Sequence, residues 1–186
     1  MTRAADRATF EVLDPERYAT AVDDLGEILA DAVDSGTPMH FVQPFSAADG
    51  AAWFRSRLPD VAAGTIRPIV ALVDGRIDGV AFIVHSTFPN APHRAEIAKV
   101  AVHRRSRGQG LGLGLMTAAE AVARDDGRWL LILDTVTGSP ADRMYRRLGW
   151  QEVGTIADYA LLADGVFAAA TYFVKDLRGR SERAEG

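Results

Sequence analysis

Apolar residues follow two different spacings along this chain, and the change of spacing predicts where helices and strands lie. Over residues 14–35 they recur every three or four positions, which is the spacing of one buried helix face. This segment opens with Asp14-Pro15, an N-cap followed by a first-turn proline, and Gly36 ends it. Three further helices are predicted over about residues 46–58, 110–124 and 139–148.

Denser apolar runs, rich in β-branched residues, predict strands. Two of these runs, residues 69–73 and 76–85, are joined by Asp74-Gly75, a dipeptide typical of a tight β-hairpin. Residues 1–8 and the stretch from Arg178 are polar and charged, so we expect tails outside a core of about residues 9–177. The predicted strands cover residues 10–13, 69–73, 76–85, 95–102, 129–135, 151–156 and 166–175.

Length and composition fit one globular domain. The chain has 186 residues, of which 48% are hydrophobic and 25% charged, which excludes a disordered or fibrous chain. The formal net charge of −4 argues against a dedicated nucleic-acid binder. There is no cysteine and no apolar run long enough to cross a membrane, so we expect a cytoplasmic protein without a membrane partner. The four histidines lack metal-binding spacing, so we expect no metal.

The segment from Val100 to Leu115 is the richest in chemistry. Here a predicted strand leads through a glycine-rich turn directly into a helix, which leaves backbone N–H groups pointing outward at the positive end of the helix dipole. Its glycines let the backbone approach an anion closely, and Arg104, Arg105 and Arg107 add positive charge. The segment therefore predicts a site for a polyanion. It contains neither the lysine of a Walker loop nor the GxGxxG pattern of dinucleotide-binding proteins.

Two motifs in the chain resemble those of a known family. Arg105-Ser-Arg-Gly-Gln-Gly110 matches Arg/Gln-x-x-Gly-x-Gly, the pyrophosphate-binding turn of the GNAT superfamily of acyl-CoA-dependent N-acyltransferases. The segment from Ala141 to Trp150 is similar to the family's fourth helix, which usually ends in Tyr-x-x-x-Gly-aromatic. The resemblance covers about residues 95–175.

The resemblance implies a mixed α/β (α+β) fold in a single domain over residues 1–186. Its twisted, mostly antiparallel, seven-stranded sheet would be flanked by about four helices and splayed between the fourth and fifth strands. The implied acyl donor is acetyl-CoA. Its pantetheine arm would lie in the splay, where the N–H of Val100 would stabilise the oxyanion. The implied cofactor-binding residues are Val100, Ala101, Val102, Arg105, Arg107, Gly108, Gln109, Gly110, Leu111 and Gly112.

Three residues are expected to be catalytic. Tyr145 matches the family tyrosine that protonates the departing thiolate. Glu96 lies early in the predicted fourth strand and Asp134 at the end of the fifth, so either could take the proton of the acceptor amine. Which of the two is the base is left open.

One position departs from the family pattern. Gly138 stands seven residues before Tyr145, where many members carry an asparagine. The contact that this asparagine makes in the family must be absent here or supplied by another residue, for which Ser139 and Thr137 are the candidates.

The expected reaction is direct transfer of an acetyl group to a primary amine. Residues 133–138 and 158–160 look most like tabtoxin-resistance-type acetyltransferases, which favours a small-molecule acceptor such as an antibiotic or toxin, and hence a resistance role. A protein or peptide acceptor and a non-catalytic acyl-CoA-binding module are the alternatives, and a homodimer is expected because dimers are common in the family. The residues expected to wall the acceptor site are Trp53, Phe54, His85, Phe88, His93, Tyr159 and the loop at Pro89–Pro92.

Overall fold

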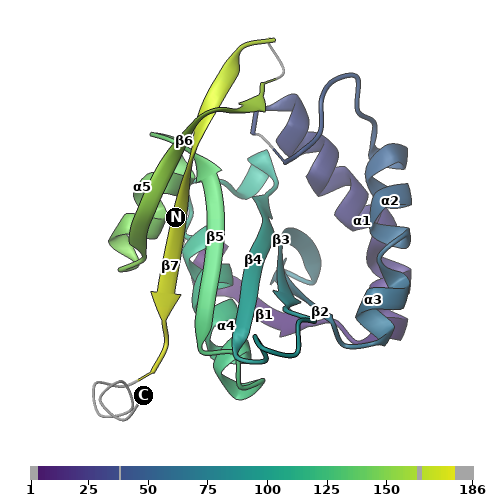
Figure 1. The fold of residues 1–186 in the computed structure, drawn as a ribbon. Helices are drawn as coiled ribbons and strands as arrows, with labels where there is room; N and C mark the ends of the chain where they lie inside the picture. Colours follow the sequence, from purple (N-terminus) through teal and green to yellow (C-terminus); the bar gives the residue numbers. More distant parts are fainter. Residues whose placement is uncertain (1–3, 38, 163–164, 179–186) are drawn as a thin grey trace.

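The computed structural model, which describes residues 4–37, 39–162 and 165–178, has one seven-stranded sheet with helices on both faces (Figure 1). The strand order is β1-β2-β3-β4-β5-β7-β6, and all neighbours are antiparallel except β4 and β5. The predicted mixed α/β fold is therefore confirmed. In chain order the elements are β1 (Ala8–Val12), α1 (Pro15–Asp34), α2 (Ala47–Arg55), α3 (Leu58–Ala62), β2 (Ile66–Val73), β3 (Arg76–His85), β4 (Arg94–Val102), α4 (Leu111–Asp125), β5 (Leu130–Val136), α5 (Pro140–Arg147), β6 (Gln151–Leu161) and β7 (Phe167–Asp176).

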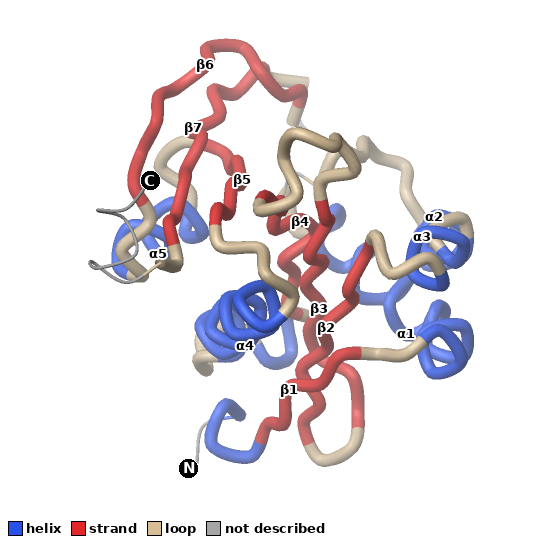
Figure 2. The backbone as a smooth tube through the Cα atoms, turned by 60° about the horizontal axis from the view of Figure 1, so that its bottom comes forward, coloured by secondary structure: helices blue, strands red, loops and turns tan. Residues whose placement is uncertain are grey.

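Each face of the sheet carries its own hydrophobic core. On one face α4 packs with Leu115 and Met116 fully buried, and on the other α1 and α2 bury Tyr18, Leu25 and Phe54. Figure 2 shows these helices on opposite sides of β1 to β4. Each large side chain of this kind stabilises the fold by about 1.5–3 kcal/mol. The two cores hold the sheet, and with it the strands that border the functional site, between the helix layers.

The helix starts follow the predicted capping residues. Asp14 accepts a hydrogen bond from the backbone N–H of Arg17 at 2.8 Å, and Ser46 forms a reciprocal capping box with Asp49. The helix expected over residues 46–58 ends earlier, at Arg55, and α3 begins separately with Pro59 in its first turn. Pro59 has no backbone N–H to continue the hydrogen bonds of α2 and is tolerated only in the first turn of a helix, so one predicted helix is two in the structure.

The amino-terminal segment differs from the expected tail. Ala4–Arg7 form a short 3-10 helix, and Ala4 is buried against the α4 core. The backbone N–H of Ala4 donates to the Gln109 side chain at 3.0 Å, and that of Ala5 donates to the Gln109 carbonyl at 3.3 Å. These contacts tie the start of the chain to the glycine-rich turn. The predicted carboxyl-terminal tail beyond Arg178 lies outside the described residues.

The predicted splay between β4 and β5 is confirmed. The two strands pair over only three positions, from Arg94–Leu130 to Glu96–Ile132. Beyond them β4 continues beside β3 and β5 continues beside β7, so the strands diverge. β4 also contains a bulge at Lys99, whose φ is 54°, opposite a shift of register on β3. The divergence opens a wedge in the middle of the sheet.

Candidate active site

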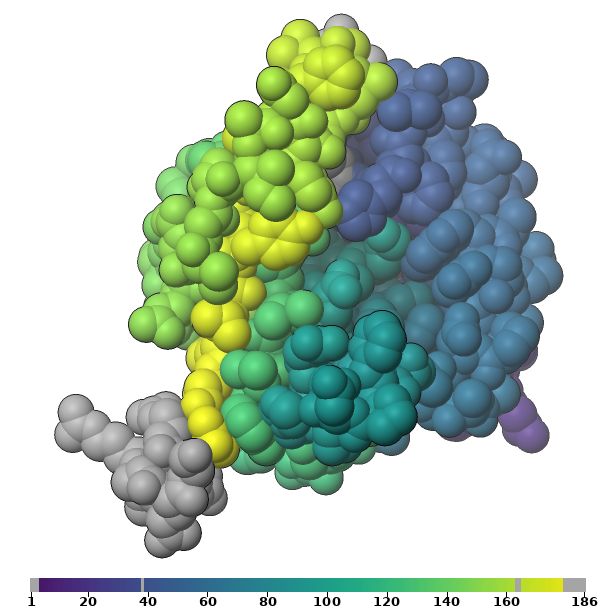
Figure 3. Space-filling view, in the orientation of Figure 1, coloured from purple at the N-terminus to yellow at the C-terminus, as the bar shows by residue number. Residues whose placement is uncertain are grey.

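A cavity of about 480 Å³ lies in the wedge between β4 and β5. It is lined by the end of α1 and the segment after it, by β4 and β5, by the start of α5, and by residues 159, 160 and 162. A second cavity of about 180 Å³ adjoins it and shares His40, Glu96, Asp134 and Tyr159. Figure 3 shows this face, with β6 and β7 (green to yellow) on one side of the hollow and the segment after α1 (blue) on the other.

All three residues expected to be catalytic line the larger cavity. Glu96 occupies the last position at which β4 pairs with β5, and Asp134 lies two residues beyond the end of that pairing. Burial raises the pKa of Glu96, and the negative charge of Asp134 raises it further, while Lys99 opposes both effects. Burial also raises the pKa of the Tyr145 hydroxyl, followed by the effect of Asp134, so this phenol keeps its proton at neutral pH. The cavity thus holds both a candidate proton acceptor and a candidate proton donor.

Lys99 is a member of the site that the sequence analysis did not identify. The bulge in β4 turns its side chain into the cavity, where Nζ donates to the carbonyl of Met39 at 3.3 Å and lies 3.1 Å from Nδ1 of His40. Nζ also lies over the rings of Phe41 and Trp53, 5.6 and 5.1 Å from their centroids. The sequence carried one indication of this role, because Lys99 is a charged residue inside the largely apolar run 95–102.

Two tyrosines close the smaller cavity from the β6–β7 side. The hydroxyl of Tyr172 donates to that of Tyr159 at 2.5 Å. This hydrogen bond raises the pKa of Tyr172, with burial and the charges of Asp134 and Glu96 adding to the shift. The Tyr172 hydroxyl therefore keeps its proton and presents a polar group to the smaller cavity without adding charge.

The glycine-rich turn has the form expected of an anion-binding site. Gly110 is the N-cap of α4 with a φ of 92°, and Gly108 has a φ of 72°, a left-handed geometry that favours glycine. Within the described parts of the chain, the backbone N–H groups of residues 108–112 donate to no protein acceptor. Orphan donors of this kind at the start of a helix favour binding of a phosphate group.

The arginines of the turn are held by buried carboxylates. Arg105 Nε donates to Asp78 at 2.7 Å, whereas Arg107 donates from Nε to the Val102 carbonyl and from Nη2 to Asp31, both at 2.7 Å. Arg107 lines the larger cavity, but Arg105 faces the β2–β3 hairpin instead. A direct contact between Arg105 and the cofactor therefore stays a prediction, and what the structure assigns to this side chain is anchorage of the turn.

The remaining residues of the predicted cofactor set contribute mainly through their backbone. Val100 lines the cavity, and the carbonyl of Val102 is already bonded to Arg107. The side chains of Ala101 and Leu111 are buried in the two hydrophobic cores. Gly112 faces Met144 of α5, whose Sδ would lie 3.3 Å from an added Cβ.

Ser139 is the better placed of the two candidates to replace the family asparagine. Ser139 lines the cavity and caps α5 by accepting from the N–H of Asp142 at 3.1 Å. The hydroxyl of Thr137 instead pairs with that of Thr171 at 2.8 Å. Gly138, with a φ of 74°, donates its N–H to Asp142 at 2.6 Å.

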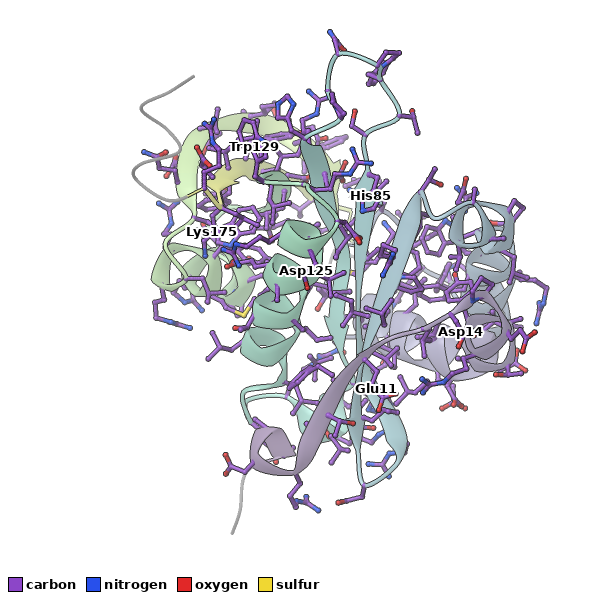
Figure 4. The ribbon with its side chains drawn as sticks, turned by 90° about the horizontal axis from the view of Figure 1, so that it is seen from below. Glu11, Asp14, His85, Asp125, Trp129 and Lys175 are labelled. Atoms are coloured by element: carbon purple, nitrogen blue, oxygen red, sulfur yellow. The ribbon has the colours of Figure 1, made fainter. Side chains whose placement is uncertain are left out.

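Most of the residues expected to wall the acceptor site lie elsewhere. Phe54 is fully buried and Phe88 is 64% exposed, and the described lining of the two cavities includes nothing from the loop at 86–93. His85 faces Asp126 on another part of the molecule (Figure 4), and His93 stacks on Trp129. Of the expected set only Tyr159 lines the cavities, while Trp53 contributes through its contact with Lys99.

Comparison with known proteins decides the family. Residues 37–150 match the family model described as "Acetyltransferase (GNAT) family". The chain belongs to the GNAT acetyltransferase family. This GNAT protein is therefore an acyltransferase, and acetyl-CoA is its acyl donor.

Solved structures of other proteins share the GNAT fold of this chain. An N-acetyltransferase from Staphylococcus aureus Mu50 is 17% identical with a TM-score of 0.75, covering 92% of this chain and 99% of that one. A phosphinothricin acetyltransferase from Sinorhizobium meliloti, solved with AcCoA, is 20% identical with a TM-score of 0.75. The match covers 94% of this chain and 91% of that one. A ribosomal-protein-alanine N-acetyltransferase from Brucella melitensis is 23% identical with a TM-score of 0.73. The match covers 91% of this chain and 99% of that one.

The described part of this GNAT protein holds neither a metal-site cluster nor a membrane-spanning helix. No group of three or more His, Asp or Glu side chains in that part gathers as a metal site. None of the helices described for this GNAT protein has the length and apolar character needed to cross a membrane.

Proposed function

We propose that this acetyltransferase moves an acetyl group from acetyl-CoA directly to a primary amine of a small molecule. The observation that carries the proposal is that Glu96, Asp134 and Tyr145 share one cavity at the point where β4 and β5 separate. A primary ammonium must lose a proton before it can attack a thioester, and the departing thiolate needs an acid. The cavity supplies both kinds of group without a covalent enzyme intermediate.

Each residue has a distinct part in this proposal. Glu96, with its raised pKa, takes the proton of the bound ammonium, and Asp134 holds the positive charge of the acceptor beside it. The backbone N–H of Val100 stabilises the negative charge that develops on the carbonyl oxygen. Tyr145, whose hydroxyl is protonated, donates its proton to the sulfur of the leaving thiolate.

The shape of the cavity supports a small acceptor. Tyr159 and Leu162 wall it from one side, and Met39 and His40 wall it from the other. The phosphinothricin acetyltransferase among the similar structures supports the same class of acceptor, and with it a resistance role. The ribosomal-protein-alanine N-acetyltransferase supports the alternative of a protein amino terminus.

We further propose that two copies associate through the edge hairpin of β6 and β7. Its apolar residues Val153, Ile156, Leu161 and Phe167 are between 45% and 69% exposed. Light scattering of the wild type and of Val153→Asp tests this point. A dimer that dissociates in the variant supports it, and a monomeric wild type contradicts it.

The experiment that tests the main proposal measures release of free thiol from acetyl-CoA against a panel of amines. The panel holds β-lactam, aminoglycoside and streptothricin-type compounds, polyamines and short peptides, and acetyl-CoA binding is followed in parallel by thermal shift. Turnover with one small amine supports the proposal. Turnover with peptides alone favours the protein acceptor, and a thermal shift without any turnover favours a non-catalytic acyl-CoA-binding module.

A further inference from the structure

The chain carries a primary amine of its own inside the acceptor site. Of its twenty-one Lys and Arg residues only two, Lys99 and Lys175, are lysines. A guanidinium stays protonated in proteins, whereas an ε-amine can lose its proton and act as a nucleophile. A lysine in this cavity therefore brings a chemistry that the many arginines of the chain cannot supply.

The two lysines differ in how their amines are held. Lys175, labelled in Figure 4, lies beside α4, where Nζ is 2.7 Å from both carboxylate oxygens of Glu120 and 2.7 Å from the carbonyl of Leu148. Three acceptor atoms, two of them on the ion-paired carboxylate of Glu120, occupy its three donor positions. Lys99, by contrast, contacts a carbonyl, an imidazole nitrogen and two aromatic faces. Among the residues that the structure describes, no carboxylate forms an ion pair with it.

The surroundings of Lys99 are those that the proposed reaction requires of an acceptor amine. It precedes Val100 on β4, and both residues line the cavity together with Glu96, Asp134 and Tyr145. Burial lowers the pKa of Lys99, while the charges of Glu96 and Asp134 act in the opposite direction. The flexible four-carbon stem lets Nζ leave His40 and move within the cavity that Val100 also lines.

We propose that Lys99 is a self-acetylation site, used when acetyl-CoA is bound and no acceptor occupies the cavity. The inference rests on the proposed function, because it uses the same proton acceptor and proton donor. The Lys99 ammonium gives one proton to Glu96, and its nitrogen attacks the carbonyl carbon of the thioester. A C–N bond forms, the C–S bond breaks with its electrons on sulfur, and Tyr145 gives its proton to the thiolate. The nitrogen loses its second proton as the amide forms, and that proton restores the Tyr145 hydroxyl. The products are acetyl-Lys99 and free CoA.

Acetylation of Lys99 changes the acceptor site in two ways. It removes the positive charge that Nζ places near His40 and over the rings of Phe41 and Trp53. It also places an acetamide in the space that an acceptor amine must enter. The modified enzyme is therefore expected to acetylate external amines more slowly, so an enzyme left with acetyl-CoA alone inactivates itself.

The test incubates the full-length protein with acetyl-CoA and no acceptor, and locates the added acetyl groups by fragmentation mass spectrometry. Lys175 serves as an internal reference in the same molecule. We expect acetylation of Lys99 at least about tenfold faster than of Lys175, and about a hundredfold slower in Tyr145→Phe than in the wild type. Lys99→Arg should remove the modification, and Lys175→Arg should leave it in place. Thermal unfolding shows that each variant is folded.

The other outcomes separate this inference from the proposed function. If an external amine is acetylated while Lys99 stays unmodified, the inference is wrong and the proposed function stands. Equal labelling of Lys99 in the wild type and in Tyr145→Phe would be uncatalysed chemistry and also contradicts the inference. If the folded protein acetylates neither Lys99 nor any amine of the panel, both fail.

Discussion

The guanidinium of Arg107 donates a hydrogen bond to the carboxylate of Asp31, with Nη2 and Oδ2 2.7 Å apart, and so joins the glycine-rich turn to the end of α1. Asp31 also accepts from the backbone N–H of Arg104 at 2.9 Å, and its side chain is only 7% exposed. Burial alone would raise the pKa of Asp31, but the hydrogen bonds from Arg104 and the positive charges of His103 and Arg107 outweigh it and lower the pKa. The carboxylate therefore stays ionised and holds the turn in place.

Replacing Asp31 with asparagine tests this role, because the side chain keeps its shape and loses its charge. We expect the KM for acetyl-CoA to rise about tenfold with a smaller change in kcat, and the free energy of unfolding to fall by about 1.5–3 kcal/mol. A lowered folded-state pKa gives stability that is present above the unfolded pKa of about 3.9 and is lost as the pH falls. The stability difference between wild type and Asp31→Asn should therefore shrink below about pH 4.

The matched control for this variant is Asp23→Asn. Asp23 lies on the same helix, and its exposed carboxylate pairs with Arg55 at 3.3 Å. A pair of this kind contributes at most about 1 kcal/mol. Steady-state kinetics and urea unfolding of the two variants test whether Asp31 positions the turn. An unchanged KM for acetyl-CoA in Asp31→Asn would contradict that role.

Tyr145→Phe tests the proposed acid. The change deletes one hydroxyl and keeps the ring that packs with Trp150 and Phe173. We expect kcat to fall about a hundredfold while the affinity for acetyl-CoA, measured by calorimetry, changes little. Tyr18→Phe is the control, because that buried hydroxyl donates to the Phe54 carbonyl within the α1 core, so its loss lowers stability and spares kcat. An unchanged kcat in Tyr145→Phe would mean that another group protonates the sulfur.

The pH dependence of kcat/KM identifies the base. Burial raises the pKa of Glu96, so a reaction that needs its carboxylate loses rate on the acidic side at a pH above the ordinary glutamate value of about 4.3. In Glu96→Gln this acidic limb should vanish, and the rate at neutral pH should fall about a hundredfold. The contrary result is a limb that persists in Glu96→Gln and disappears in Asp134→Asn, which would assign the base to Asp134.

The parts of the site that depend on local sequence were predictable. The glycine-rich turn, the N-cap of α5 and the position of Tyr145 are fixed by residues that are neighbours in the chain. Glu96 and Asp134 could also be placed, because a parallel pair of strands that separates must bring these two positions to the opening. These residues could be placed from the sequence because their positions depend only on short-range geometry and on one strand pairing.

The acceptor side was predicted poorly because it depends on contacts between distant residues. His40 lies in the segment between α1 and α2, which has no periodic pattern, yet it lines both cavities and contacts Lys99. The direction of the Lys99 side chain depends on the bulge opposite β3. The expected histidines, His85 and His93, sit instead beside Asp126 and Trp129, contacts that no local pattern indicates.

The close approach of α1 and α2 gives a last test, in which two effects oppose each other. A Cβ added at Gly26 would lie 2.5 Å from the carbonyl oxygen of Ala47 and 2.5 Å from the backbone nitrogen of Ala51, so the two backbones touch here. Helix propensity alone predicts that Gly26→Ala stabilises by about 1 kcal/mol. The clash is with backbone atoms that cannot rotate away, and we expect a net loss of about 2 kcal/mol or more.

The same variant should affect the acceptor more than the donor. Displacing α2 moves the segment that carries His40, whereas the glycine-rich turn is held by Asp31 of α1 and Asp78 of β3. We therefore expect a larger rise in KM for the acceptor amine than for acetyl-CoA. Gly154→Ala in β6 is the control, since no atom lies within 4 Å of its added Cβ, and it should leave stability unchanged. Urea unfolding that finds Gly26→Ala as stable as the wild type would show that the helices can separate without cost.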